Sequence, residues 1–204
     1  MMSISSEMVK ELRDKTGAGV MDCKKALEAA GGDMHKAVDE LRKRGAAAAE
    51  KRSGRSTGEG RVEAYIHPGN RVGVLLEVDC ETDFVARTDD FQNFCHDVAL
   101  HIAAAAPVSV SREDVPAEII AKEREIYTEQ AKQSGKPEAV WEKMIDGRLQ
   151  KYFAENVLLE QPFVKDPDKK VSDLLTAVAA KLGENMIIRR FTRFQIGIYE
   201  NESE

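Results

Sequence analysis

The sequence predicts an α+β protein, with a small helical module at the N-terminus and a mixed core behind it. Three observations predict this class. Apolar residues recur at helical spacing through residues 1–45, apolar and polar residues alternate in two adjoining segments within 62–80, and a Ser-Gly-Lys-Pro connector joins two long amphipathic segments. We therefore expect a three-helix module, then a core with a three-stranded antiparallel sheet, packed helices and a protruding antiparallel helical hairpin.

Three short helices are expected in residues 1–45, the first predicted domain. Ser5 or Ser6 can cap the first helix, and Asp33 can cap the third. Their apolar positions form stripes that can share one small core, namely Met8, Leu12, Val20, Cys23, Leu27, Ala30, Met34, Ala37, Val38 and Leu41. Residues 46–60 are the predicted linker, in which alanines can extend the third helix before a flexible Gly-, Ser- and Arg-rich stretch.

Residues 61–204 are the predicted core domain, and its sheet begins with a hairpin. Apolar residues alternate on both strands around a His-Pro-Gly-Asn turn: Val62, Ala64 and Ile66, then Val72, Val74, Leu76 and Val78. The second strand is expected to bury one face, formed by Leu76, Val78 and Cys80. Its other face should be wet and carries Glu77, Asp79 and Glu81. A third strand is expected near the C-terminus, where one face carries Phe194, Ile196 and Ile198.

A helical hairpin is expected at about 116–157. Gly135 can end its first helix and Pro137 can start its second, so two antiparallel helices should pack along a seam. The expected seam consists of Ile119, Ile126 or Tyr127, Trp141, Ile145, Leu149 and Tyr152. A last helix, at about 171–182, precedes the final strand.

Composition excludes several classes of protein. The chain has 204 residues, of which 42% are hydrophobic and 32% charged, and this balance suits a soluble globular protein rather than a disordered one. No apolar stretch approaches the roughly 20 residues of a membrane span, and the start of the chain has no apolar signal core. The cysteines form no CxxC pair, which favours a reduced, cytoplasmic location. A net charge of −6 gives no general attraction to nucleic acid.

Candidates for catalysis or metal binding are weak. No segment has the order of a glycine-rich phosphate-binding loop. Each histidine lacks a second ligand at metal spacing, and the cysteines fall on faces that we expect to be buried; these residues are His35, His67, His96, His101, Cys23, Cys80 and Cys95. We therefore expect no catalytic residue, no metal and no cofactor. A binding protein fits better than an enzyme.

The end of the second strand is the first candidate site. Asp83 and Phe84 follow the strand directly, although a turn needs neither a carboxylate nor a large ring. A loop tip held by a rigid strand is a common place for function. The same position also suits a phenylalanine that folds back onto the core, so two readings stand at this point.

Four stretches of the chain resemble the bacterial elongation factor Ts family, in the family's order. They are "VKELRDKTGAGVMDCKKALEAAGGD" (9–33), "LEVDCETDFVAR" (76–87), "QSGKP" (133–137) and "QPFVKD" (161–166). The resemblance implies a guanine-nucleotide exchange factor for elongation factor Tu, the GTPase that carries aminoacyl-tRNA to the ribosome. It also implies a ubiquitin-associated-like fold for the three-helix module.

The resemblance also implies a set of partner-binding residues. The family's TDFV motif falls on Thr82, Asp83, Phe84 and Val85. This tip would enter the GTPase near its magnesium and nucleotide phosphates. Phe84 would be the wedge that dislodges the metal, and Asp83 would help to hold the inserted ring in place. In the N-terminal module, the residues implied to grip the GTPase are Lys10, Arg13, Thr16, Gly17, Gly19, Val20 and Met21.

Val20 and Met21 cannot both face the core of the module, because adjacent helical positions point in different directions. We expect Met21 to be the exposed one, since a flexible thioether side chain adapts well to a partner surface.

Longer family members carry a second core subdomain and a C-terminal helical module, whereas this chain ends just past its last strand. Self-association could replace the missing half of the interface with the GTPase, so a homodimer is a hypothesis that the resemblance allows and that no residue pattern establishes. Two other classes of protein would each account for part of the sequence. A ubiquitin-binding adaptor would explain three helices but gives no reason for the TDFV tip. A nucleic-acid-binding module could use the basic linker residues but requires aromatics on a basic face. We expect no direct nucleic-acid contact and no membrane contact.

Overall fold

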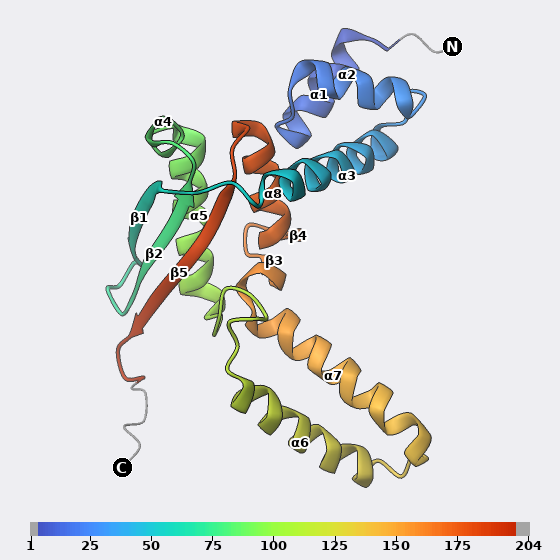
Figure 1. Cartoon of the computed structure of the whole chain (residues 1–204), viewed down its shortest axis with the longest axis vertical. Helices are drawn as coiled ribbons and strands as arrows, with labels where there is room; N and C mark the ends of the chain where they lie inside the picture. Colours follow the sequence, from blue (N-terminus) through green and yellow to red (C-terminus); the bar gives the residue numbers. More distant parts are fainter. Residues whose placement is uncertain (1–3, 199–204) are drawn as a thin grey trace. The chain divides into compact units, whose positions relative to one another are not determined.

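The structure is a computed structural model that describes residues 4–198, and its architecture is α+β (Figure 1). Its helices are α1 (Ser6–Thr16), α2 (Val20–Ala29), α3 (Met34–Arg52), α4 (Asp83–Ala86), α5 (Asp89–Ala105), α6 (Ala117–Gln133), α7 (Trp141–Asn156) and α8 (Val171–Leu182). Its strands are β1 (Glu59–Ile66), β2 (Val72–Cys80), β3 (Pro162–Phe163), β4 (Asp166–Lys170) and β5 (Met186–Gln195).

The chain divides into two compact units. The first comprises the N-terminal residues through Glu63, Glu77–Asp97 and Asp173–Arg189. The second comprises Ala64–Leu76, Val98–Ser172 and the residues from Arg190 onward. The predicted boundaries at 45 and 60 remain a prediction.

Helices α1, α2 and α3 surround a small core of their own, as the apolar stripes predict. Its buried members are Leu12, Cys23, Ala26, Leu27 and Ala37. The predicted caps are confirmed, because the side chain of Ser5 accepts a hydrogen bond from the backbone of Met8, and that of Asp33 accepts one from Lys36. Likeness to a ubiquitin-associated fold stays a prediction.

Helix α3 runs on to Arg52, so the first part of the predicted linker is helical. Alanine is the strongest helix former, and four alanines in a row at 46–49 extend the helix past Gly45. Of the predicted linker, only residues 53–58 lie outside the named helices and strands, because β1 begins at Glu59.

The main sheet has three antiparallel strands in the order β1-β2-β5 (Figure 1). On β2 the predicted alternation is confirmed, because Leu76, Val78 and Cys80 are fully buried. The acids on its other face are half-buried rather than wet. One reason is that Asp79 pairs with Arg189, at 2.7 Å between Oδ2 and Nε.

The buried face of β1 is not the apolar one that the alternation of Val62, Ala64 and Ile66 predicts. Val62 and Ile66 are 66% and 61% exposed, whereas Glu63 and Tyr65 are buried. Glu63 tolerates this position because Arg61 donates to its carboxylate at 2.7 Å and His96 lies 3.4 Å away. A strand that points a paired acid inward necessarily points its aliphatic neighbours outward.

Helices α6 and α7 form the predicted hairpin, with an apolar core of their own. Its buried members are Val115, Ala131, Ile145, Leu149, Phe153 and Val157, with Ile120, Tyr127, Trp141 and Tyr152 packed against them. The predicted seam residue Ile119 is wrong, since it is 39% exposed. Of the two alternatives, Tyr127 packs on the seam and Ile126 is 39% exposed. Gly135 adopts a left-handed φ of 70° after α6, as a helix end requires. Pro137 starts a short 3₁₀ turn, and α7 itself begins at Trp141.

A small antiparallel ribbon of β3 and β4 was not predicted from the sequence. The buried imidazole of His101 holds it to α5. Its Nε2 lies 2.9 Å from the side-chain oxygen of Gln161, and its Nδ1 accepts from the backbone N–H of Val164 at 3.2 Å. Because Nδ1 accepts, the ring proton is on Nε2, and His101 is a packed core residue.

Among residues 4–198, no helix is long and apolar enough to cross a membrane.

Candidate functional site

The predicted strand tip is a capped helical turn. Strand β2 ends at Cys80, and the next residues form α4, a single turn from Asp83 to Ala86. Thr82 caps this turn, because its hydroxyl oxygen accepts from the backbone N–H of Val85 at 3.4 Å. The cap fixes the direction in which the turn leaves the strand.

Phe84 points into solvent from this turn. Its side chain is 79% exposed, whereas those of its neighbours Thr82, Asp83 and Val85 are half-buried. The reading in which Phe84 folds back onto the core is therefore wrong. A large ring held in water gains nothing for the fold, so its position needs another explanation.

The rest of the turn is tied down by polar contacts. Asp83 forms an ion pair with Arg87 one turn later, at 2.8 Å between Oδ2 and Nη2. Thr88 donates its hydroxyl to the carbonyl of Val85 at 2.8 Å and accepts from the backbone N–H of Phe91 at 3.3 Å, so one side chain joins α4 to the start of α5. Phe84 therefore stands on a braced turn rather than a loose loop.

A residue that sequence reasoning missed also holds this turn. The carboxylate of Glu184, between α8 and β5, accepts from the backbone N–H groups of Glu81 and Thr82, at 3.1 Å each. It also accepts from the hydroxyl of Thr82 at 2.6 Å. Glu184 lies 102 positions from Thr82, so no periodicity or spacing in the sequence signals the contact.

The α1–α2 turn carries most of the second set of candidate residues. Lys10, Arg13, Gly17, Gly19, Val20 and Met21 are exposed, and Thr16 is half-buried. The hydroxyl of Thr16 donates to the carbonyl of Leu12 at 2.7 Å, and Gly17 ends α1 with a φ of 69°. These features shape a tight, fixed connection between the two helices.

Val20 does not belong to the buried stripe, which corrects the prediction. It is 51% exposed and Met21 is 62% exposed, so both apolar side chains face water. Val20 is the first residue of α2, and the small core begins one turn later at Cys23. Two adjoining apolar side chains on a rigid turn make a better contact surface than Met21 alone.

The cysteine thiols are not activated as nucleophiles. All three cysteines are buried and free. Burial raises the pKa of Cys80 to about 11 and that of Cys95 to about 12, so both thiols are protonated at neutral pH. Within the described part of the chain, no group of three His, Cys, Asp or Glu residues could hold a metal ion.

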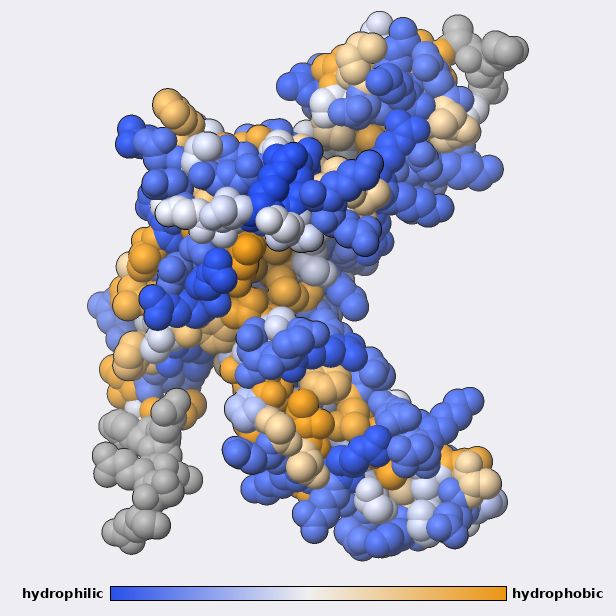
Figure 2. All heavy atoms as spheres, in the orientation of Figure 1, coloured by the Kyte–Doolittle hydropathy of each residue, from blue (hydrophilic) through white to orange (hydrophobic). Residues whose placement is uncertain are grey.

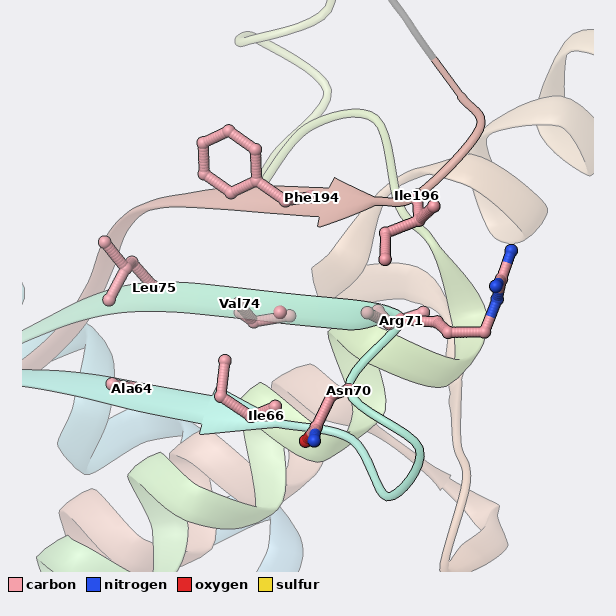
Figure 3. A pocket seen from close by; sticks show the side chains of 10 residues that line it. Ala64, Ile66, Asn70, Arg71, Val74, Leu75, Phe194 and Ile196 are labelled. Atoms are coloured by element: carbon pink, nitrogen blue, oxygen red, sulfur yellow. The ribbon is translucent and has the colours of Figure 1, made fainter.

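A second exposed apolar surface covers one face of the sheet. It forms a shallow groove lined by Ala64 and Ile66 of β1, by Leu75 of β2 and by Phe194 and Ile196, with Arg71 at one end (Figure 3). Figure 2 shows hydrophobic side chains gathered along these strands. Ile66, Leu75, Phe194 and Ile196 are between 50% and 66% exposed, a patch that a monomer rarely leaves open to water.

The sequence comparison decides the family. The model of the family described as Elongation factor TS matches residues 6–198, nearly the whole chain. The chain belongs to the elongation factor Ts family.

Individual elongation factor Ts relatives are similar over almost their whole length. One from Carboxydothermus hydrogenoformans is 62% identical over 194 residues, which cover 95% of this chain and 89% of the relative. One from Thermoanaerobacter sp. strain X514 is 57% identical over 194 residues, covering 95% of each chain. One from Desulfotalea psychrophila is 57% identical over 196 residues, covering 96% of this chain and 100% of the relative.

Membership of the elongation factor Ts family supports a role in translation elongation, as the nucleotide-exchange factor of elongation factor Tu. Such a factor acts by binding and carries out no covalent chemistry.

Proposed function

We propose that this protein accelerates GDP release from elongation factor Tu by inserting the α4 turn beside the magnesium and phosphate end of the nucleotide site. The observation that carries the proposal is the exposure of Phe84, 79%, on a turn braced from both sides. Rigid presentation matters because a mobile ring would lose its conformational freedom on binding and would push less effectively.

A GTPase holds its nucleotide with the amides of a phosphate-binding loop and with a magnesium ion that bridges phosphate oxygens. An apolar ring that enters beside this loop displaces it and weakens the metal's contacts. Asp83 assists as a half-buried carboxylate beside the ring. Because coupling between two ligands is reciprocal, nucleotide weakens binding of the factor by the same ratio, and rebinding of GTP releases it.

The N-terminal module supplies a second contact in this proposal. Val20 and Met21 offer an apolar surface on the α1–α2 turn, and exposed Lys10 and Arg13 of α1 supply charge. Two separate contacts on one chain raise affinity, since binding through the first makes the second intramolecular. The module therefore anchors the GTPase while the α4 turn acts on it.

We also propose that the groove on the sheet is covered by a second copy of this chain. Two sheets pack well face to face, at about 10 Å, when their facing residues are apolar. The residues that would face the partner copy are Ala64, Ile66, Leu75, Phe194 and Ile196. A dimer would bring together two α4 turns and two N-terminal modules. The place of action that we propose is the cytoplasm, where translation occurs.

Release of labelled GDP from purified elongation factor Tu tests the exchange proposal. Adding this protein should accelerate release in the presence of magnesium. After a chelator has removed the metal, the further acceleration by the factor should be much smaller. The factor can then act only by displacing the phosphate-binding loop, because the magnesium contacts are already lost. An equal acceleration with and without magnesium would contradict action on the metal.

A further inference from the structure

Two side chains form reciprocal bonds between the end of β2 and the start of β5. Glu184 accepts from the backbone N–H groups of Glu81 and Thr82, at 3.1 Å each. In return, the carboxylate of Glu81 accepts from the backbone N–H of Asn185 at 2.6 Å. These bonds lie beyond the last residue of β2, where sheet pairing no longer satisfies the backbone N–H groups.

The third bond of Glu184 controls the cap of α4. A threonine hydroxyl has one hydrogen to donate and two lone pairs to accept with. Thr82 donates its hydrogen to Glu184 at 2.6 Å, and the same oxygen accepts from the backbone N–H of Val85 at 3.4 Å. Donation to Glu184 orients the hydroxyl so that a lone pair faces the N–H of Val85, and the turn that carries Phe84 is capped.

We propose that Glu184 is a positioning residue for nucleotide exchange. It orients Thr82, Thr82 caps α4, and the capped turn holds Phe84 outward. This inference rests on the proposed function of Phe84, but it adds a residue that lies outside the TDFV motif and that does not itself need to touch the GTPase.

Three variants separate the parts of this arrangement. Glu184→Ala removes both acceptor oxygens and with them all three hydrogen bonds. Glu184→Gln keeps one oxygen for the two backbone N–H groups and offers an amide to the Thr82 oxygen, so it should preserve the geometry. Thr82→Val removes only the hydroxyl. Asp114→Ala is a matched control, because Asp114 likewise accepts from the backbone N–H and hydroxyl of a single residue, Ser111, at 2.9 Å and 2.7 Å.

The free protein provides a test that does not depend on exchange activity. Amide hydrogen exchange should become faster at Glu81, Thr82 and Val85 in Glu184→Ala, whereas Asp114→Ala should leave these amides unchanged. Unchanged protection in Glu184→Ala would overturn the inference. If that variant folds poorly, Thr82→Val gives the same test at Val85 without disturbing the bonds between Glu184 and the backbone.

Exchange kinetics test the consequence. Glu184→Ala should lower the maximal rate of stimulated GDP release about tenfold, the scale of losing a hydrogen bond to a charged group. The concentration of factor giving half the maximal rate should change little, because the N-terminal module is intact. Glu184→Gln should recover most of the rate. Rates equal to wild type in Glu184→Ala would overturn the inference.

A double-mutant cycle identifies the route of the effect. If Glu184 acts through Phe84, adding Glu184→Ala to Phe84→Ala should cause no further loss. Independent losses that multiply would mean that Glu184 acts in another way, and the inference would fail. Should Phe84→Ala alone exchange normally, the proposed function of Phe84 fails instead, and the hydrogen-exchange result still decides whether Glu184 holds the turn.

Discussion

Arg42 of α3 and Asp173 of α8 form an ion pair in which one guanidinium nitrogen lies 2.7 Å and 2.8 Å from the two carboxylate oxygens. Near this pair, α3 passes α8 at Gly45, where an added Cβ would lie 3.7 Å from the side chain of Thr176. Arg42 is 65% exposed, so water screens the pair, and it contributes about 1 kcal/mol or less to the free energy of unfolding.

Deleting the residues before Ser53 should therefore leave the remaining chain folded. The deletion removes a small core that α1, α2 and α3 share among themselves, together with the exposed Arg42–Asp173 pair. The shortened protein should bind elongation factor Tu more weakly and need a higher concentration to release GDP. Circular dichroism and a titration of GDP release measure the two effects. Unchanged exchange at low concentration would show that the module is not an anchor.

Phe84→Ala should separate stability from function. Its ring is 79% exposed, so the melting temperature should stay nearly unchanged, as for most surface substitutions. Stimulated GDP release should fall roughly thirtyfold, since a central apolar anchor is typically worth about 2 kcal/mol or more. Asp83→Ala should act in the same direction with a smaller loss, because water can replace a half-exposed carboxylate.

Val108→Ala is the control for Phe84→Ala, since Val108 is also exposed, at 54%, but lies outside the α4 turn, the α1–α2 turn and the groove on the sheet. It should change neither melting nor exchange. A Phe84→Ala protein that melts early yet exchanges normally per folded molecule would mean that the wedge is placed wrongly.

Phe194→Lys should prevent self-association. The residue is 66% exposed in the apolar groove, and burying an unpaired ammonium group against a second sheet is costly. Sedimentation at micromolar concentration should show the wild type near twice 22.6 kDa and the variant near 22.6 kDa. Val108→Lys places the same charge elsewhere and should remain dimeric. A wild-type protein that stays monomeric yet fully active would contradict the dimer.

His101 should make the protein less stable in mild acid. Burial lowers the pKa of its imidazole below the usual value of 6.5, and a second ring proton would remove the acceptor that binds the Val164 N–H. The unfolded chain takes up that proton more readily, so the contribution is complete above 6.5 and is lost as pH falls below it. Melting curves from about pH 7.5 to about pH 5 should show this slope in the wild type.

His101→Gln keeps a polar side chain that does not titrate in this range. It should be less stable overall but should lose part of the acid slope. An unchanged slope would assign the acid sensitivity to other groups.

Regular patterns in the sequence predicted most of the fold. The stripes of α1 to α3 and the alternation of β2 report burial directly, because one side of each element faces a core. The pattern failed on β1, where Glu63 is buried through its bonds to Arg61 and His96, partners that no periodicity reveals. It failed again at Val20, because a helical stripe does not say where a small core ends.

Only part of the candidate site could be predicted from the sequence. A ring and an acid after a strand drew attention to Asp83 and Phe84, and the exposure of Phe84 agrees with a contact role. The support beneath it could not be predicted, because Glu184 reaches Thr82 across 102 positions of chain. Such bonds form only once β2 and β5 are neighbours in the sheet.

Asn185 has a consequence for how the chain tolerates changes in length. Its side-chain amide donates to the carbonyls of Ser53 and Arg55, at 3.4 Å and 3.0 Å, directly after α3. The same short turn, 184–185, therefore holds both the exit of α3 and the base of the α4 turn. Residues inserted at Gly58 would form a longer loop and leave the hydrogen bonds of Asn185 and Glu184 in place. A single residue inserted beside Asn185 would shift the end of α3 and the base of the α4 turn at once. It would therefore change the distance between the N-terminal module and the α4 turn.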